Sequence, residues 1–112
     1  MFSREDELYL LDMLESIRAV ASYVENVGRE SFDTDRKTQA ATIRELEIIG
    51  EAAGRISAET RTAHPEVNWR ILKDFRNVLS HEYFGVNLDI VWDIVQNKLP
   101  QLEKQVSLIV GS

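Results

Sequence analysis

The chain has 112 residues, of which 44% are hydrophobic and 29% are charged, and it contains no cysteine. This size and composition suit one globular domain over residues 1–112, and the lack of thiols excludes disulfides and thiolate metal sites. The net charge of −6 argues against a protein that captures nucleic acid through a broad positive field.

The charge is unevenly spread along the chain. Residues 1–35 carry three basic and nine acidic side chains, whereas residues 36–76 carry eight basic and six acidic ones. We therefore expect any anion-binding surface to draw on the middle third of the chain. The first ten residues place acids before the first apolar run, unlike a secretory signal, and no apolar run is long enough to cross a bilayer. We expect a soluble, cytoplasmic protein.

The first segment has apolar residues at helical spacing. Ser3 is followed by Asp6 and Glu7, which predicts a helix N-terminus because the helix dipole favours acids there. Gly28 predicts the end of this helix. The predicted buried stripe consists of Leu10, Leu14, Ile17, Ala21 and Val24.

A second helix is predicted from a cap between Asp33 and Asp35 to about Ser57. Gly50 and Gly54 lie inside it, and each costs roughly 1 kcal/mol relative to alanine. Close approach of another helix usually compensates this cost, so we expect such an approach here. The predicted buried stripe consists of Thr42, Leu46, Ile49, Ala53 and Ile56.

Two further helices are predicted in the C-terminal half. Asn68 is expected to cap a third helix that ends near Gly85, and Asn87 is expected to cap a fourth. Pro100 lies inside the apolar pattern of the fourth helix. It should kink that helix, because it has no N–H to donate to the Gln96 carbonyl.

The fold class follows from these elements. The sequence shows no alternating β pattern, and a short turn is predicted at residues 60–64. Four long helices with short connections favour an all-α, antiparallel four- to five-helix up-down bundle.

Polar side chains that could do chemistry cluster in the stretch FRNVLSHEYFGVN, residues 75–87. Arg76 and His81 are five positions apart, which on a continuous helix separates them by about 140° around the axis. Asn77 and His81 would share one face. Cooperation between Arg76 and His81 therefore requires either local unwinding near His81 or a partner from another chain.

Arg76 and His81 together meet the needs of metal-free phosphodiester cleavage. The planar arginine fork matches phosphate oxygens, and histidine exchanges a proton near neutral pH. The histidine would activate a ribose 2′-hydroxyl, and the arginine would stabilise charge on the phosphorane. A structural role is the alternative, because cations and histidines near a helix C-terminus also satisfy its terminal carbonyls and dipole.

The run RNVLSHEYFGVNLDIVWDIV resembles the HepT-like branch of the HEPN superfamily. The family pattern is an arginine, four to six residues and then a histidine, with a polar residue after the arginine and a tyrosine two positions after the histidine. The residues that fit it are Arg76, Asn77, His81 and Tyr83. The stretch RELEIIGEAAGRIS, residues 44–57, resembles the second helix of the family, so the resemblance covers about residues 40–100.

The resemblance implies a metal-independent ribonuclease toxin that needs no cofactor and acts as a homodimer. Arg76 and His81 of both subunits would line one cleft, and Asn77 would position the phosphate or the histidine. The RNA, for which tRNA is a candidate, would be left with a 2′,3′-cyclic phosphate. The partner would be a minimal nucleotidyltransferase antitoxin that attaches AMP to Tyr83, where the added phosphate would repel RNA. A covering role for an amphipathic aromatic at the helix end is the alternative for Tyr83.

Other residues have weaker claims to a functional role. Glu51 could orient a cleft residue, or it could belong to a solvated face and pair with Arg55 one turn away. Arg44, Arg70 and Lys73 could guide RNA or could simply solvate the surface. With two histidines far apart in sequence, a structural metal site is not expected.

Two rival functions remain open at this point. One is a non-catalytic module that binds a nucleotide or the nucleotidyltransferase without turnover, which the acidic net charge favours. The other is a purely structural dimerisation bundle. Replacing Arg76 or His81 with alanine distinguishes these from an enzyme, which would lose cleavage while it stays folded.

Overall fold

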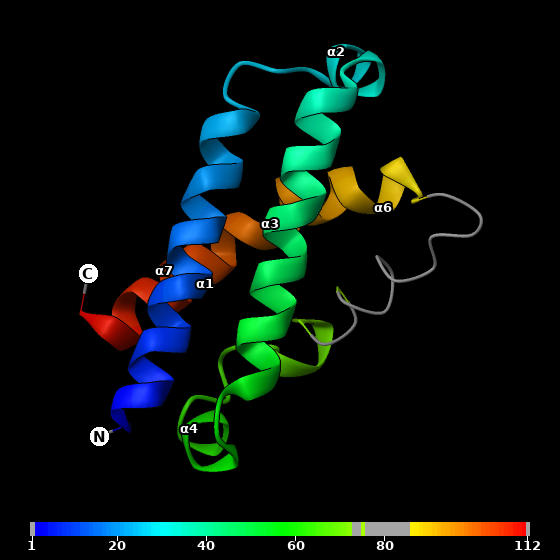
Figure 1. The fold of residues 1–112 in the computed structure, drawn as a ribbon. Helices are drawn as coiled ribbons and strands as arrows, with labels where there is room; N and C mark the ends of the chain where they lie inside the picture. The colour runs from blue at the N-terminus through cyan, green and yellow to red at the C-terminus, as the bar shows by residue number, and fades with distance from the viewer. Residues whose placement is uncertain (1, 73–74, 76–85, 112) are drawn as a thin grey trace.

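The computed structural model describes residues 2–72, 75 and 86–111. Every element in these ranges is helical, which confirms the predicted all-α class (Figure 1). A helical segment over residues 69–72, with Phe75 also helical, lies between α4 and α6. The remaining elements are α1 (Arg4–Tyr23), α2 (Arg29–Thr34), α3 (Arg36–Arg55), α4 (Ala58–Ala63), α6 (Leu88–Asp93), the π-helical turn η2 (Ile94–Lys98) and α7 (Leu99–Val110).

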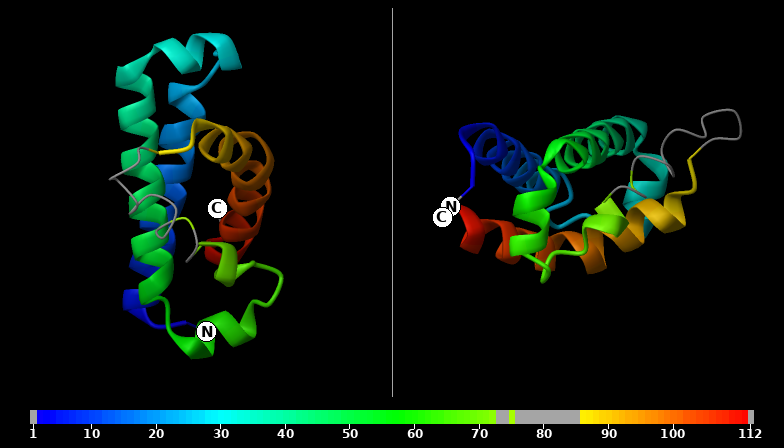
Figure 2. Two further views of the ribbon diagram at one scale, coloured as in Figure 1. Left: turned by 90° about the vertical axis from the view of Figure 1, so that its right-hand side faces the viewer. Right: turned by 90° about the horizontal axis from the view of Figure 1, so that it is seen from below.

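The long helices form two layers. The helices α1 and α3 lie side by side and antiparallel, and the continuous run α6–η2–α7 crosses behind them (Figures 1 and 2). The helix α1 contacts both α3 and α7, so its buried stripe lies at the centre of the core. That stripe contains the predicted Leu10, Leu14 and Ile17. None of the helices in the described part of the chain has an apolar stretch long enough to span a membrane.

Local capping explains where most helices begin. The Ser3 hydroxyl accepts a hydrogen bond from the Asp6 amide (3.1 Å), and the Asp35 carboxylate accepts one from the Thr38 amide (3.1 Å). Asn87 caps α6 in the same way. These three caps are where the sequence predicted them, because each uses a short polar side chain to satisfy a free helical N–H.

The predicted end of the first helix at Gly28 is wrong. The helix α1 ends at Tyr23, and Asn26, two residues before Gly28, takes the left-handed conformation (φ 60°). Asparagine tolerates this region better than most residues. Gly28 instead precedes the short helix α2, which buries Phe32 against Trp92 at a ring-centroid distance of 5.0 Å.

The expected close approach of a helix is not found at Gly54. A Cβ atom added there would meet no heavy atom within 4 Å in the described structure. Gly50, one turn earlier, is buried. The expectation failed at Gly54 because that position lies on the exposed side of α3.

The predicted kink at Pro100 takes the form of a π-helical turn. The Leu99 amide donates to the Ile94 carbonyl, five residues back, directly before the proline. Proline cannot continue the usual hydrogen-bond ladder, so an extra residue is accommodated in the turn that precedes it. The helix α7 then continues to Val110.

A buried carboxylate joins α1 to the junction of α3 and α4. Asp6 is 3% exposed, and it accepts hydrogen bonds from the Ser57 amide (3.0 Å), the Ser57 hydroxyl (2.6 Å) and the Thr60 hydroxyl (2.6 Å). Burial alone would raise the pKa of Asp6, but these hydrogen bonds outweigh it and lower the pKa below its ordinary value. The ionised carboxylate therefore stabilises this junction.

Candidate functional site

The predicted catalytic residues Arg76, Asn77 and His81, and the predicted modification site Tyr83, lie outside the described residues. Their assignments stay predictions. The described residues nevertheless include both flanks of this segment, which end at Phe75 and begin again at Val86.

The flank before the segment is anchored in the core. Asn68 caps the helical segment at residues 69–72 by accepting a hydrogen bond from the Ile71 amide (3.2 Å), which confirms the predicted cap. The Trp69 indole donates to the His64 carbonyl (3.0 Å) and holds the preceding loop against this helix. Phe75, which is bonded directly to Arg76, is 2% exposed. The chain thus enters the predicted catalytic segment from a fixed position.

The flank after the segment is held by charge. The Asn87 side chain accepts from the Asp89 amide at 2.9 Å, and the Asp89 carboxylate pairs with the Arg29 guanidinium at 2.6 Å. Arg29 also pairs with Asp33 at 2.7 Å within α2. Hydrogen bonds from Arg29 to Asp33 and to Asp89 raise the pKa of the guanidinium above its ordinary value. The helix α2, which the sequence did not predict, therefore holds the start of α6 through the ion pair between Arg29 and Asp89.

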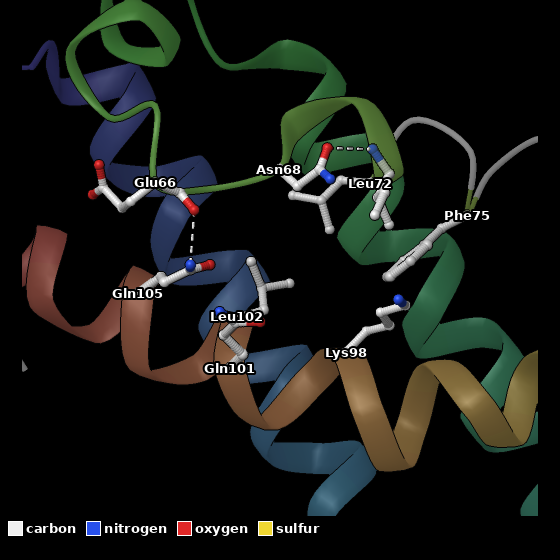
Figure 3. Close-up of a pocket in the computed structure, with 9 residues that line it drawn as sticks. Glu66, Asn68, Leu72, Phe75, Lys98, Gln101, Leu102 and Gln105 are labelled. Atoms are coloured by element: carbon white, nitrogen blue, oxygen red, sulfur yellow. Dashed lines mark hydrogen bonds between the residues drawn. The ribbon is translucent and has the colours of Figure 1, made fainter.

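A pocket of about 370 Å³ lies between the first flank and the C-terminal helix (Figure 3). We call it the amide pocket and define it by the residues of its two walls, with Glu66 at one end. One wall consists of Asn68, Ile71, Leu72 and Phe75, and the other of Lys98, Gln101, Leu102 and Gln105.

Polar groups of the amide pocket lie around its opening. The Gln105 side-chain nitrogen donates to the Glu66 carbonyl (2.8 Å), which ties the C-terminal helix to the loop before residue 68. The Lys98 side chain extends toward Phe75 at the other end of the pocket (Figure 3). One end of the pocket therefore lies beside Glu66. The other end lies beside Phe75, the residue that precedes Arg76, with the amine of Lys98 nearby.

The predicted support residue Glu51 lies elsewhere on α3. It is exposed and borders a shallow hollow of about 140 Å³ together with Tyr9, Asp12 and Arg55. Glu51 and Arg55 form no ion pair within 4 Å, so the proposed pairing one turn apart is wrong for these two described residues. The solvated face expected for Glu51 is confirmed by its exposure. Its proposed role at the cleft remains a prediction.

The basic residues proposed to guide RNA are divided between described and undescribed parts of the chain. Arg44 and Arg70 are exposed, and Arg44 pairs with Glu47 at 3.4 Å. Lys73 lies outside the described residues. Neither described arginine borders the amide pocket.

Sequence reasoning missed the amide pocket, although a signal for it was present. The fourth helix was predicted from its apolar stripe alone, which does not show a pocket. Lys98, Gln101 and Gln105 recur at i, i+3 and i+7, which places them on one face next to the buried Leu102. A polar stripe beside a buried residue can indicate a groove, but the opposite wall lies some thirty residues earlier in the sequence.

Comparison with known proteins gives consistent matches over nearly the whole chain. The sequence model of the family described as "Ribonuclease HepT-like" matches residues 13–109. A protein of Methanocaldococcus jannaschii named as a candidate RNase is 36% identical over 110 residues, which cover 98% of this chain and 91% of that protein. "Probable ribonuclease HepT" of Thermococcus cleftensis is 39% identical over 100 residues, which cover 89% of this chain and 91% of that protein. No solved structure gives a significant match.

Proposed function

We propose that this chain, which belongs to the ribonuclease HepT-like family, is an endoribonuclease that uses Arg76 and His81. The observation that carries the proposal is the family match over residues 13–109, a range that contains both residues. The names of two relatives, which describe ribonucleases, support the same reaction class.

The proposed reaction is an internal transesterification without a metal ion. His81 accepts the proton of a ribose 2′-hydroxyl, and the 2′-oxygen attacks the neighbouring phosphorus. Arg76 stabilises the charge that develops on the phosphorane oxygens, and Asn77 positions the phosphate or the histidine. The bond from phosphorus to the 5′-oxygen then breaks. The 5′-oxygen takes up a proton, and the other product carries a 2′,3′-cyclic phosphate.

The catalytic cleft is proposed to lie between two copies of the chain, each of which contributes Arg76 and His81. Glu51 is proposed as a support residue for this cleft. Mixing an Arg76→Ala variant with a His81→Ala variant tests the shared cleft, because each mixed dimer keeps one arginine and one histidine. Recovery of part of the activity supports the shared cleft, whereas two variants that stay inactive after subunit exchange contradict it.

The proposed biological role is that of a toxin neutralised by a minimal nucleotidyltransferase, which attaches AMP to Tyr83. An adenylate carries negative charge and would repel the RNA backbone from the neighbouring residues. Intact mass of the protein after incubation with that partner and ATP measures the modification. A Tyr83→Phe variant should gain no mass and should stay active in the presence of the partner.

The central test is cleavage of an RNA pool that includes tRNA, in the presence of EDTA, with protein whose intact mass shows no modification. Loss of a general acid–base group costs about 10²- to 10⁴-fold in rate, so the cleavage rate of His81→Ala should fall by at least about 10²-fold. His64→Ala is the matched control, because it removes the other histidine, which contacts Glu66 at 3.2 Å. Equal cleavage by the parent and by His81→Ala would contradict the assignment.

A non-catalytic nucleotide-binding or nucleotidyltransferase-binding module is the second candidate function. The net charge of −6 favours it, because a strong RNA binder is usually more basic. This module would bind its partner or a nucleotide and leave the whole RNA pool intact. Absence of cleavage by unmodified parent protein would therefore favour this second function.

A further inference from the structure

The two walls of the amide pocket are built on the same helical pattern. Residues 68, 71, 72 and 75 stand at i, i+3, i+4 and i+7, and residues 98, 101, 102 and 105 repeat that spacing. This spacing is that of one helical face, and the two walls are opposed (Figure 3). Faces that oppose each other in a helical protein are usually apolar.

The two walls of the amide pocket are not wholly apolar, because they also carry polar side chains. Leu72, Phe75 and Leu102 are between 2% and 5% exposed and form an apolar floor. Above this floor the remaining wall positions carry three amides and a lysine, and Ile71 is the one further apolar residue among them. The pocket thus combines an apolar base with hydrogen-bonding groups at its mouth, which is typical of small-molecule sites.

Several of these polar groups have no partner among the described residues. The Asn68 oxygen caps its helix and the Gln105 nitrogen binds the Glu66 carbonyl. The Asn68 nitrogen, the Gln105 oxygen and both polar atoms of Gln101 make no hydrogen bond within the described part of the structure. As far as the described residues go, both donors and acceptors at the mouth of the pocket therefore have no protein partner.

A nucleobase fits this combination of groups. It is a flat apolar ring whose edge carries both donors and acceptors, and side-chain amides pair with such edges. A volume of about 370 Å³ lies near the lower end of the range for small-molecule pockets, which suits one nucleoside better than a longer segment. A simple lipid or an aliphatic ligand would leave the amides unsatisfied.

The position of the charges orients this ligand. Lys98 lies at the end of the pocket beside Phe75, whereas the Glu66 carboxylate lies at the opposite end (Figure 3). A phosphate is attracted to the lysine and repelled by the carboxylate. Phe75 is also the residue bonded to Arg76, so the phosphate end of the pocket is the end from which the predicted catalytic segment continues.

We infer that the amide pocket binds the base of a nucleotide next to the cleaved bond, with the phosphate of that nucleotide at Lys98. This inference rests on the proposed ribonuclease function and names a substrate contact for it. The pocket holds the base of one nucleotide, and its lysine end lies beside Phe75, the residue that precedes Arg76 in the sequence. Gln101 and Gln105 read the edge of the base, and Lys98 fixes the register of the backbone.

The first test measures binding of the four nucleoside 5′-monophosphates without any turnover. Side-chain amide signals of Asn68, Gln101 and Gln105 are followed by NMR during titration of the labelled protein. We expect these signals to shift with saturation at millimolar nucleotide. Signals that do not move with any of the four nucleotides would overturn the inference.

The second test uses matched variants on the same helix. Lys98→Met and Gln101→Ala each remove one pocket contact from an exposed position, so the fold should persist. We expect each to weaken nucleotide binding by about 5- to 10-fold, as for loss of one polar contact. The controls are Lys104→Met and Gln96→Ala, whose residues are exposed and do not border the pocket. Equal weakening by the control variants would contradict the assigned site.

Cleavage kinetics separate this inference from the proposed function. If the parent cuts RNA, Lys98→Met should raise KM more than it lowers kcat, and Gln101→Ala should flatten the base preference beside the cut. RNA cleavage with no nucleotide at the pocket would overturn this inference and leave the ribonuclease intact. Nucleotide binding without any RNA cleavage would refute the proposed function and, with it, the pocket's role in cleavage.

Discussion

Replacing Asp6 with alanine is expected to destabilise the protein by about 3 kcal/mol. Each hydrogen bond to a charged group contributes about 1.5–3 kcal/mol, and the cost of burying the carboxylate offsets part of that sum. Asp6 accepts three such bonds, from the Ser57 amide, the Ser57 hydroxyl and the Thr60 hydroxyl. Alanine would leave these donors beside an apolar side chain in a site that is 3% exposed in the parent.

The dependence of this effect on pH follows from the lowered pKa of Asp6. A carboxyl whose folded-state pKa lies below its unfolded value stabilises the fold at pH values above the unfolded pKa. That contribution is lost as the pH falls from the ordinary value of 3.8 through the folded-state pKa. The difference in unfolding free energy between parent and Asp6→Ala should therefore be full at pH 6 and should shrink below about pH 4.

Urea unfolding followed by circular dichroism measures this difference at pH 6 and at several lower values. For a domain of this size, a loss of about 3 kcal/mol corresponds to a fall in Tm of about 10 °C, which thermal unfolding would measure. Glu15→Ala is the matched control, because Glu15 is an exposed acid on the same helix. An Asp6→Ala variant as stable as Glu15→Ala, or a difference that does not shrink in acid, would refute the reasoning.

The exposed ion pairs of Arg29 and the exposed glycine at position 54 give two smaller predictions. Arg29→Met should lower the melting temperature only slightly, because its pairs with Asp33 and Asp89 are exposed, and melting curves should show this cost shrinking in 1 M salt. A loss of stability that is unchanged by salt would contradict an electrostatic contribution from these ion pairs. Gly54→Ala should stabilise the protein by about 0.5–1 kcal/mol in urea unfolding, because the helix gains propensity and the added Cβ meets open space. A lower urea midpoint would contradict that account.

Helix starts could be predicted from the sequence because their causes are local. Ser3, Asp35 and Asn87 each accept from an amide two or three residues ahead, so the signal and its partner lie in one short window. The same locality applies to Pro100, whose missing N–H disturbs only the adjacent turn. The end of α1 was missed because Asn26, and not Gly28, adopts the left-handed backbone.

The features that could not be predicted depend on residues far apart in the chain. Asp6 was read as an acid favoured by the helix dipole, whereas its partner Ser57 is 51 residues away. The salt bridge of Arg29 spans 60 residues to Asp89. The predicted catalytic residues are a different case. Arg76 and His81 belong to a short motif, so their prediction needs no knowledge of tertiary contacts.

The charge of the chain constrains how it can bind RNA. With a net charge of −6, the long-range field of the protein opposes a polyanion, and nine of the nineteen acids lie within the first 35 residues. Affinity for RNA would therefore have to come from contacts at short range, such as the proposed contacts of Lys98 with a single phosphate and of the amides with a base. Contacts of this kind release few counterions and read the base directly. An acidic ribonuclease built in this way would bind RNA weakly overall. The nucleotide held in the amide pocket would then determine where the RNA is cut.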